Sequence, residues 1–257
     1  MSRTKSASSP LTNDQQTAAR KKRSAQMFWK RYFAFYDTLN EARPYRDMIE
    51  RHAELLQPAA NELILDAGTG TGNVAVELLA KEARVIGIDF CEPALEKCRQ
   101  KAPQAEFRFA DLSQPLEFDS NSFDKIACCA VLHVLDRETQ EFAIREFFRV
   151  LKPGGALAVT AFRTGFNSMK VYVAALKERR KTSGLADTAL FAARYSISTA
   201  RILYYVWRIK KREKSGDYNF LTRDELTGML SKAGLELLKF EMVFADQCIS
   251  ALARKPI

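Results

Sequence analysis

The sequence lacks any apolar run long enough to cross a bilayer. Its longest uninterrupted candidate, residues 202–207, is ended by Arg208, whereas a spanning helix needs roughly 20 consecutive apolar residues. We therefore expect no transmembrane anchor within these residues.

Residues that form disulfides or bind metals are also scarce. The chain has five cysteines and two histidines, and no two cysteines are spaced as CxxC. An odd number of cysteines without such pairs argues against a disulfide framework and against a zinc site. We predict buried thiols in a reducing compartment, and therefore a cytoplasmic protein without a metal.

Acidic residues are scarce in two segments, which accounts for the net charge of +9. Residues 1–26 contain six Lys and Arg against one acid, and residues 163–217 contain thirteen against four, so the rest of the chain is mildly acidic. The first segment also has almost nothing to bury, which predicts a disordered basic arm over 1–26. Its composition leaves organellar import open as a second interpretation.

Short apolar runs alternate with helix-length segments through most of the chain. Residues 27–56 have a helical pattern interrupted near Pro44, and five apolar runs follow between 63 and 162. This alternation is typical of a buried parallel sheet with crossover helices. Two last runs, 235–243 and 247–255, predict an antiparallel hairpin at the sheet edge. We therefore expect an α/β fold with a mostly parallel sheet and an N-terminal helical segment.

A glycine-rich loop follows the first predicted strand. Glycines allow a tight turn and let a ligand approach the backbone N–H groups at the start of the next helix, where the helix dipole favours an anion. We expect a negatively charged group to bind here. The strand ends at Asp66, and the loop continues through Ala67, Gly68, Thr69, Gly70, Thr71 and Gly72.

The glycine spacing distinguishes two classes of ligand. A dinucleotide fingerprint would place its third glycine at position 73, but that residue is Asn73 and the third glycine is Gly72, which argues against NAD. The loop resembles instead motif I of the class I methyltransferases that use S-adenosylmethionine (SAM), in which an acid ends the first strand before a GxGxG loop.

Three further matches extend this resemblance over residues 63–162. Asp89 ends the second predicted strand, Asp111 ends the third and is followed by Leu112, and LKPGG at 151–155 forms a turn before the fifth. The resemblance implies a Rossmann-like, seven-stranded, mostly parallel sheet with SAM as the cofactor. It also implies that Asp89 accepts the ribose hydroxyls and that Asp111 and Leu112 read the adenine.

Most residues expected to bind SAM lie at or just after strand ends, where ligands bind in such sheets. Helix capping and turn formation are the alternative roles of the acids. Tyr36, which precedes Asp37, resembles a segment that many methyltransferases fold over SAM, and packing as a core aromatic is its alternative. The full set is Tyr36, Asp66, Ala67, Gly68, Thr69, Gly70, Gly72, Asp89, Phe90, Asp111, Leu112 and Ala130.

His133 is the candidate catalytic residue near the methyl group. It follows the fourth strand and resembles the LHH segment of the family, but Val134 replaces the second histidine. A structural histidine is the alternative. Methyl transfer needs little acid–base help, because an activated donor reacts once donor and acceptor are held in contact.

The insertion at 163–217 is expected to be a helical lid, because insertions after the fifth strand cover the acceptor pocket in this superfamily. Within it, residues 190–214 predict a helix with an apolar side and a basic end, which suits an anionic membrane surface, as does the segment 20–31. A lid packed on the core with solvated charges is the alternative. The apolar positions are Phe191, Tyr195, Ile202, Tyr205, Val206 and Ile209.

The overall pattern resembles the ubiquinone and menaquinone C-methyltransferases and the phospholipid N-methyltransferases. This implies a domain over 27–257 that methylates a hydrophobic, lipid-like or quinone-like small molecule, in the cytoplasm or at the membrane surface. A soluble metabolite as acceptor and a SAM-fold binding module without catalysis stay open. Nucleic acid is not expected as a partner, because the fourth strand lacks the Asp/Asn-Pro-Pro-aromatic signature.

Overall fold

The computed structural model describes residues 26–33, 37–213 and 219–257. The expected basic arm over 1–26 therefore lies outside the described residues except at its last position. The predicted SAM contact Tyr36 lies outside them as well.

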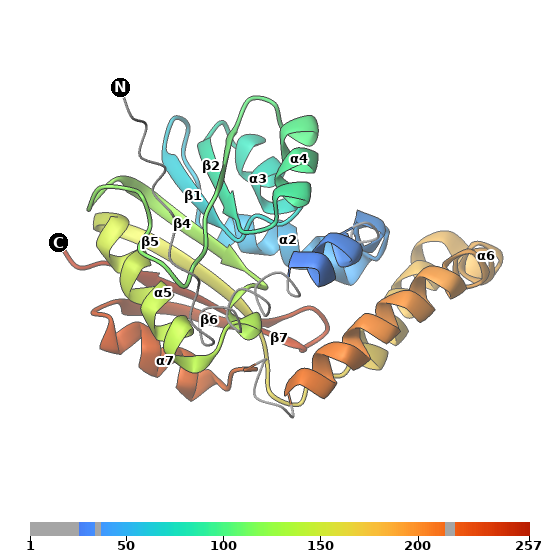
Figure 1. Cartoon of the computed structure of the whole chain (residues 1–257). Helices are drawn as coiled ribbons and strands as arrows, with labels where there is room; N and C mark the ends of the chain where they lie inside the picture. The colour runs from blue at the N-terminus through green and yellow to red at the C-terminus, as the bar shows by residue number, and fades with distance from the viewer. Residues whose placement is uncertain (1–25, 34–36, 214–218) are drawn as a thin grey trace, which may run out of the picture.

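A seven-stranded sheet forms the centre of the molecule (Figure 1). The order across it is β3-β2-β1-β4-β5-β7-β6. β1 to β5 run parallel, and β7 runs antiparallel to both β5 and β6. The predicted Rossmann-like sheet with an antiparallel edge hairpin is confirmed. The strands are β1 (Leu63–Ala67), β2 (Arg84–Asp89), β3 (Glu106–Phe109), β4 (Phe123–Cys129), β5 (Leu151–Phe162), β6 (Glu236–Val243) and β7 (Cys248–Arg254).

Helices cover both faces of this sheet. Central strand residues such as Ile64, Leu65 and Ile126 are fully buried, as expected for a parallel sheet that is covered on both sides. One face carries α2 (Arg43–Leu55), α3 (Asn73–Leu79) and α4 (Glu92–Lys101), and the other carries α5 (Arg137–Val150) and α7 (Arg223–Lys232). Two short 3-10 helices, η1 (Asp37–Glu41) and η2 (Leu132–Val134), precede α2 and α5.

Side-chain caps explain where α5 and α7 begin. Asp136 accepts the N–H of Thr139 at 2.8 Å at the start of α5. Thr222 and Glu225 form a capping box at the start of α7. Such caps satisfy N–H groups that the first helical turn leaves unpaired.

The start of β5 differs from the sequence prediction. The turn expected at 151–155 belongs to the strand, because Leu151 pairs with Phe123 before the register shifts and Lys125 pairs with Ala156. Gly154, with φ of +76°, donates its N–H to the Lys255 carbonyl at 2.9 Å. A local irregularity in pairing thus absorbs the glycines that the sequence assigned to a turn.

The insertion between β5 and α7 is occupied by α6 (Ser168–Glu213), which consists of two helical arms. Gly184, with φ of +81° and ψ of 179°, separates an arm over 168–183 from an arm over 185–213. In Figure 1 the arms lie against each other and project away from the sheet. The insertion is helical as expected, and its action as a lid stays a prediction.

Contacts on either side of Gly184 hold the two arms together. Arg179 pairs with Asp187 at 2.6 Å, and its guanidinium lies 4.3 Å from the centre of the Phe191 ring. The side chains at 38, 194–203, 205–206 and 208–213 lie outside the structural description.

Candidate active site

The glycine loop after β1 has a backbone conformation that favours glycine. Gly68, Gly70 and Gly72 have φ of +75°, +56° and +81°. A Cβ on Gly68 would lie 2.3 Å from Cγ2 of Val131, so the loop approaches the segment after β4 too closely for any side chain. Gly68 and Gly70 also line a cavity. The loop therefore presents bare backbone to that cavity.

Two buried carboxylates, Asp66 and Asp89, stand beside this loop. Asp66 accepts the Thr69 hydroxyl at 2.6 Å, and Asp89 accepts the N–H of Gly70 at 3.0 Å and of Cys91 at 2.9 Å. Burial raises the pKa of Asp66 to about 7 and that of Asp89 to about 6, because the ionised carboxylates lose hydration. A ligand with positive charge next to Asp66 would restore its ionised form.

The cavity has a volume of about 240 Å³ and lies at the carboxyl ends of the central strands. Of the described residues predicted to bind SAM, Ala67 and Gly72 are outside its lining, since Ala67 is fully buried and Gly72 packs against Cys98. Roles in binding stay predictions for all of them. Those in the lining are Asp66, Gly68, Thr69, Gly70, Asp89, Phe90, Asp111, Leu112 and Ala130, with the candidate catalytic residue His133.

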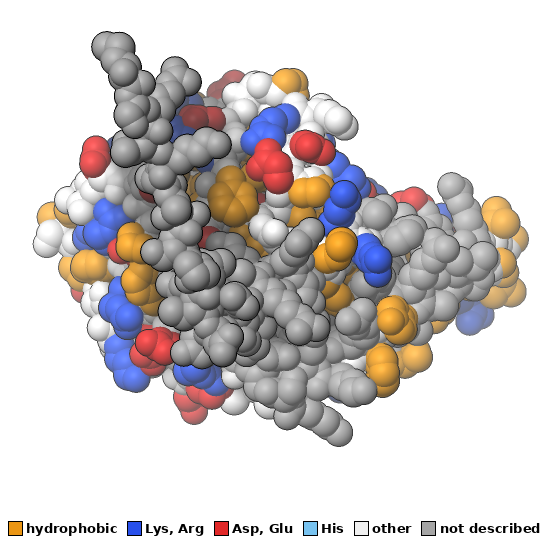
Figure 2. Space-filling view, in the orientation of Figure 1, with side chains coloured by type: hydrophobic (Ala, Val, Ile, Leu, Met, Phe, Trp, Pro, Cys, Tyr) orange, Lys and Arg blue, Asp and Glu red, His pale blue; other side chains and the backbone are white. Residues whose placement is uncertain are grey.

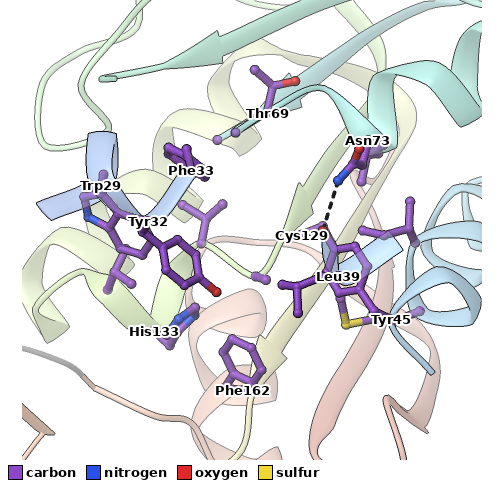
Figure 3. Close-up of a pocket in the computed structure, with 18 of the residues that line it drawn as sticks. Trp29, Tyr32, Phe33, Leu39, Tyr45, Thr69, Asn73, Cys129, His133 and Phe162 are labelled. Carbon is purple, nitrogen blue, oxygen red and sulfur yellow. Dashed lines mark hydrogen bonds between the residues drawn. The ribbon is translucent and has the colours of Figure 1, made fainter. Parts of the chain in front are cut away.

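The cavity divides into two parts of different chemistry. Its charged side chains, among the described residues, are Asp66, Asp89 and Asp111, and we call the part around them and the glycine loop the polar half. In Figure 3, Thr69 lies at one end of the space and His133 and Phe162 lie at the other. We call this second part the aromatic half, lined by Trp29, Tyr32, Tyr45, His133, Phe162, Phe166, Phe220 and Phe244.

His133 is a neutral side chain within the aromatic half. Its ring stands edge-on to Phe162 with centroids 4.4 Å apart, and the Phe220 ring lies 5.8 Å away. Burial lowers the pKa of His133 to about 3, because the imidazolium ion would lose its hydration. At pH 7 the ring is therefore uncharged.

Gln140 fixes the η2 turn that carries His133. This fully buried side chain donates from Nε2 to the carbonyls of Leu132 at 2.7 Å and Asn219 at 2.9 Å. Asn219 in turn donates its N–H to the His133 carbonyl at 2.9 Å. The position of His133 is thus tied to the segment that follows α6.

A polar network holds the N-terminal segment over the polar half. Asp37 accepts the Thr71 hydroxyl at 2.7 Å and Lys101 Nζ at 3.0 Å. Burial opposes ionisation of Asp37, but these hydrogen bonds lower its pKa overall. Asn73 donates to the Tyr45 hydroxyl at 3.2 Å, as the dashed line in Figure 3 shows.

Sequence reasoning missed most of the aromatic half. Phe162 could have been found, because it ends β5 at the same edge of the sheet as Asp66 and Asp89. Phe166, Phe220 and Phe244 come from three connections outside the strands, and no motif in the sequence links them.

The aromatic side chain at position 28 does not lie where the sequence predicted. Phe28 packs inward with Phe166 and Phe220, and Trp29 lines the cavity. The expectation that Phe28 meets a membrane is therefore wrong, because its ring is buried against other aromatic rings, whereas membrane contact by the half-buried Trp29 stays a prediction.

The donor set of the polar half fits SAM. Loop N–H groups suit its carboxylate, the buried acids suit its cationic groups and ribose hydroxyls, and apolar walls from Ile88 and Leu112 suit its adenine. Within the described ranges, no cluster of His, Cys, Asp or Glu could hold a metal ion. Nor does any helix in those ranges have the length and apolar character to span a membrane.

Sequence comparison finds methyltransferases. Residues 64–155 match the family model described as a methyltransferase domain. A ubiquinone/menaquinone biosynthesis C-methyltransferase UbiE of Geotalea daltonii is 33% identical over 141 residues, which is 50% of this chain and 59% of that protein. A demethylmenaquinone methyltransferase of Clavibacter sepedonicus is 36% identical over 42% of this chain and 44% of that protein. The chain thus spans about half the length of these curated relatives.

Structural comparison gives the same fold at low sequence identity. The magnesium protoporphyrin IX methyltransferase ChlM of Synechocystis, with bound SAH, superposes with a TM-score of 0.57 at 16% identity, covering 85% of this chain and 87% of that one. The [4+2]-cyclase SpnF superposes with a TM-score of 0.57 at 21% identity, covering 83% and 82%. The second example shows that this fold does not fix the reaction.

Proposed function

We propose that this chain is a class I SAM-dependent methyltransferase whose acceptor is an uncharged, largely apolar small molecule. The methyltransferase-domain match and the sheet order support the first half of this statement. They confirm the resemblance that the glycine loop and the strand-end acids indicated. The nature of the acceptor rests on the aromatic half of the cavity.

The observation that carries the acceptor proposal is where charge lies in the cavity. The described lining has acids only in the polar half, whereas the aromatic half offers rings and the neutral His133. An ionised acceptor would lose hydration there without gaining a counter-charge, which costs several kcal/mol. A flat, uncharged ring with an apolar substituent fits best, and the quinone-linked relatives agree with this class.

Different residues of the polar half bind different parts of SAM. Asp89, already fixed by the Gly70 and Cys91 N–H groups, retains lone pairs for two ribose hydroxyls. Asp66 supplies negative charge near the loop, and the loop N–H groups face a carboxylate. When bound, SAM supplies a methyl group activated by its sulfonium.

The aromatic half positions the acceptor and excludes water. Phe162 and Phe220 flank His133, so an acceptor ring can stack while one polar substituent reaches the imidazole. With a pKa near 3, His133 is a weak base. Its proposed role is to orient the acceptor by a hydrogen bond, and rate enhancement then comes from holding the two reactants in contact.

The test is methyl transfer from radiolabelled SAM to a panel of acceptors matched in ring but not in charge. A prenylated, uncharged benzoquinol should be methylated, whereas the same ring bearing a carboxylate should react at least about 100-fold more slowly, given the cost of an unpaired buried charge. Asp89→Ala serves as the inactive control. Preference for the carboxylated ring would overturn the acceptor class, and failure of the wild type to bind SAM would overturn the enzyme assignment.

A further inference from the structure

The second arm of α6 is apolar on two opposite sides. On the side facing the first arm, Phe191 is buried and lines the cavity. On the other side, Leu185 and Leu190 are each 67% exposed. A helix that is apolar on both sides needs an apolar environment on its outer side as well as its inner one.

Exposed apolar side chains occur again farther along the arm. Helical spacing of three and four residues places these positions on one face, and Tyr204 and Trp207 are 51% and 57% exposed. Positions 185 and 207 are about 33 Å apart along the helix at 1.5 Å per residue. We call this face the outer stripe, comprising the exposed residues Leu185, Ala186, Ala189, Leu190, Ala193, Tyr204 and Trp207.

The face that the sequence predicted to meet a membrane is a different one. That prediction used the helix face that begins with Phe191. In the structure, Phe191 is buried against the first arm. The expectation is therefore wrong for Phe191, because both sides of the arm are apolar and sequence alone does not say which is covered.

The second arm is also basic in sequence. The second arm contains six Lys and Arg against Asp187 and Glu213. Three of these arginines recur at intervals of seven in the sequence, at positions 194, 201 and 208. An apolar face on a basic helix matches the surface of an anionic bilayer, where acyl chains lie beneath phosphate groups.

The inner side of the same hairpin reaches the proposed acceptor site. Val171, Tyr172 and Ala175 of the first arm and Phe191 of the second line the same cavity as His133. The cavity lining therefore extends from the aromatic half onto side chains of both arms. Figure 2 shows hydrophobic side chains together with Lys or Arg at the outer end of the projecting hairpin.

We propose that the α6 hairpin lies on an anionic bilayer through the outer stripe, so that a membrane-dissolved acceptor enters the cavity between its two arms. The bilayer contact stands on the exposed leucines, the two exposed aromatic residues and the basic sequence of the second arm. The route of the acceptor rests on the proposed function.

The experiment is co-sedimentation of the full chain with vesicles of phosphatidylcholine alone or mixed with phosphatidylglycerol. Wild type should partition onto the anionic vesicles, and salt should weaken this binding. Leu185→Glu with Leu190→Glu should lower the partition coefficient about tenfold or more. The matched control is Leu237→Glu with Leu238→Glu on β6, whose side chains are 40% and 49% exposed, and it should bind like wild type.

A second measurement on the same samples locates the contact on the stripe. The tryptophan emission of wild type should shift to the blue on anionic vesicles, and Trp207→Phe should remove that shift, since Trp29 lies in the cavity. Failure of wild type to bind, or equal binding by the Leu185/Leu190 variant, would overturn the proposal. Sedimentation showing a dimer that this variant dissociates would assign the stripe to a second copy instead.

Calorimetry with SAM separates this proposal from the proposed function. The Leu185/Leu190 variant should bind SAM as wild type does, because neither leucine lines the described cavity. Vesicle binding without SAM binding would leave the docking surface standing and reject the enzyme assignment. SAM binding without vesicle binding would leave the enzyme assignment standing and reject the docking surface.

Discussion

The two halves of the cavity are built in different ways from the same chain. The polar half comes from strand ends and one loop that are close in sequence, and its key contacts join Asp66, Thr69, Gly70 and Asp89. The aromatic half is assembled from the helix of residues 26–33, α2, η2, the end of β5 and three later connections. The sheet therefore determines the polar half, whereas the helices and connections packed at the edge of the sheet determine the aromatic half.

This difference separates donor binding, which all SAM-dependent enzymes of this fold require, from acceptor binding, which differs between them. The polar half places buried carboxylates, raised in pKa, at positions that any chain of this sheet order can use for SAM. The aromatic half has no such constraint, and its rings come from segments whose length and sequence can vary freely. Substitutions in the two halves should therefore have separable effects on donor binding and on acceptor turnover.

The largest effect is expected from Asp89→Ala in the polar half. This change removes the acceptor of the Gly70 and Cys91 N–H groups together with the predicted contacts to ribose. Loss of two charge-assisted hydrogen bonds, at about 1.5–3 kcal/mol each, predicts at least a roughly 100-fold rise in the Kd for SAM. Calorimetric titration measures it. Asp224→Ala, an exposed acid on α7, should leave the Kd unchanged, and a Kd within about threefold of wild type for Asp89→Ala would contradict the assignment.

Asp66→Asn should separate stability from binding. Because the folded-state pKa of Asp66 is raised from 3.8 to about 7, the folded protein holds a proton that the unfolded chain has lost between those values. The free energy of unfolding of the unliganded protein should therefore fall as pH rises from about 4 to about 7. The asparagine variant escapes this loss and should be more stable at pH 8 by on the order of 2–4 kcal/mol, while binding SAM more weakly.

Thermal unfolding of both proteins at pH 5 and pH 8 checks this expectation. The difference in Tm should reach several degrees at pH 8 and should be clearly smaller at pH 5, where only the first part of the loss above pH 4 has occurred. Equal Tm differences at the two pH values would show that Asp66 is not destabilised by its burial. A buffer series in the same titrations should also show proton release when wild type binds SAM near pH 6.

The polar half could be predicted from the sequence because its residues are local and chemically distinctive. Asp66, the glycines after it and Asp89 occupy fixed places relative to strands that the apolar runs already reveal. The fold followed from the same runs, although β3 ends at Phe109, two residues before the predicted end at Asp111. The misplaced boundary at 151–155 arose because glycines that usually mark a turn can also occur in an irregular strand.

The aromatic half could not be predicted because burial is decided by tertiary contact. Phe28 and Phe191 have apolar surroundings in the sequence that suit a membrane or a core equally well, and both are buried. Position 73 shows the same limit, since in the sequence Asn73 stands out only as a departure from a glycine pattern. In the structure it lines the cavity and bonds Tyr45 and Lys101.

Phe162→Leu tests the aromatic half as Asp89→Ala tests the polar half. Phe162 packs against His133, Phe166 and Phe220, and loss of its ring contacts at about 0.5–1.5 kcal/mol predicts roughly a tenfold fall in kcat/KM for an uncharged acceptor. The Kd for SAM should change less than about twofold. Steady-state assays combined with calorimetry test both, with Phe148→Leu on α5 as the control. An equal loss of SAM affinity would show that the two halves are one energetic unit.

The smallest effect is expected where the structure joins the N-terminal segment to the polar half. Asp37 is bonded to Thr71 and Lys101, and both ion-pair partners are partly exposed, so the pair should contribute no more than about 1 kcal/mol. Asp37→Asn should therefore raise the rate of SAM dissociation by a few-fold, measured by stopped-flow displacement.

Lys101→Met should raise this rate by a similar factor, and the double variant should add little, because each change breaks the same contact. Additive effects would mean that Asp37 acts through its other partners, Thr71 and Lys97. If instead dissociation is unchanged while turnover of the acceptor falls, the N-terminal segment belongs functionally to the aromatic half. The N-terminal segment would then act mainly through Trp29 and Tyr32, which line the aromatic half. The contact of Asp37 with Thr71 of the glycine loop would matter less.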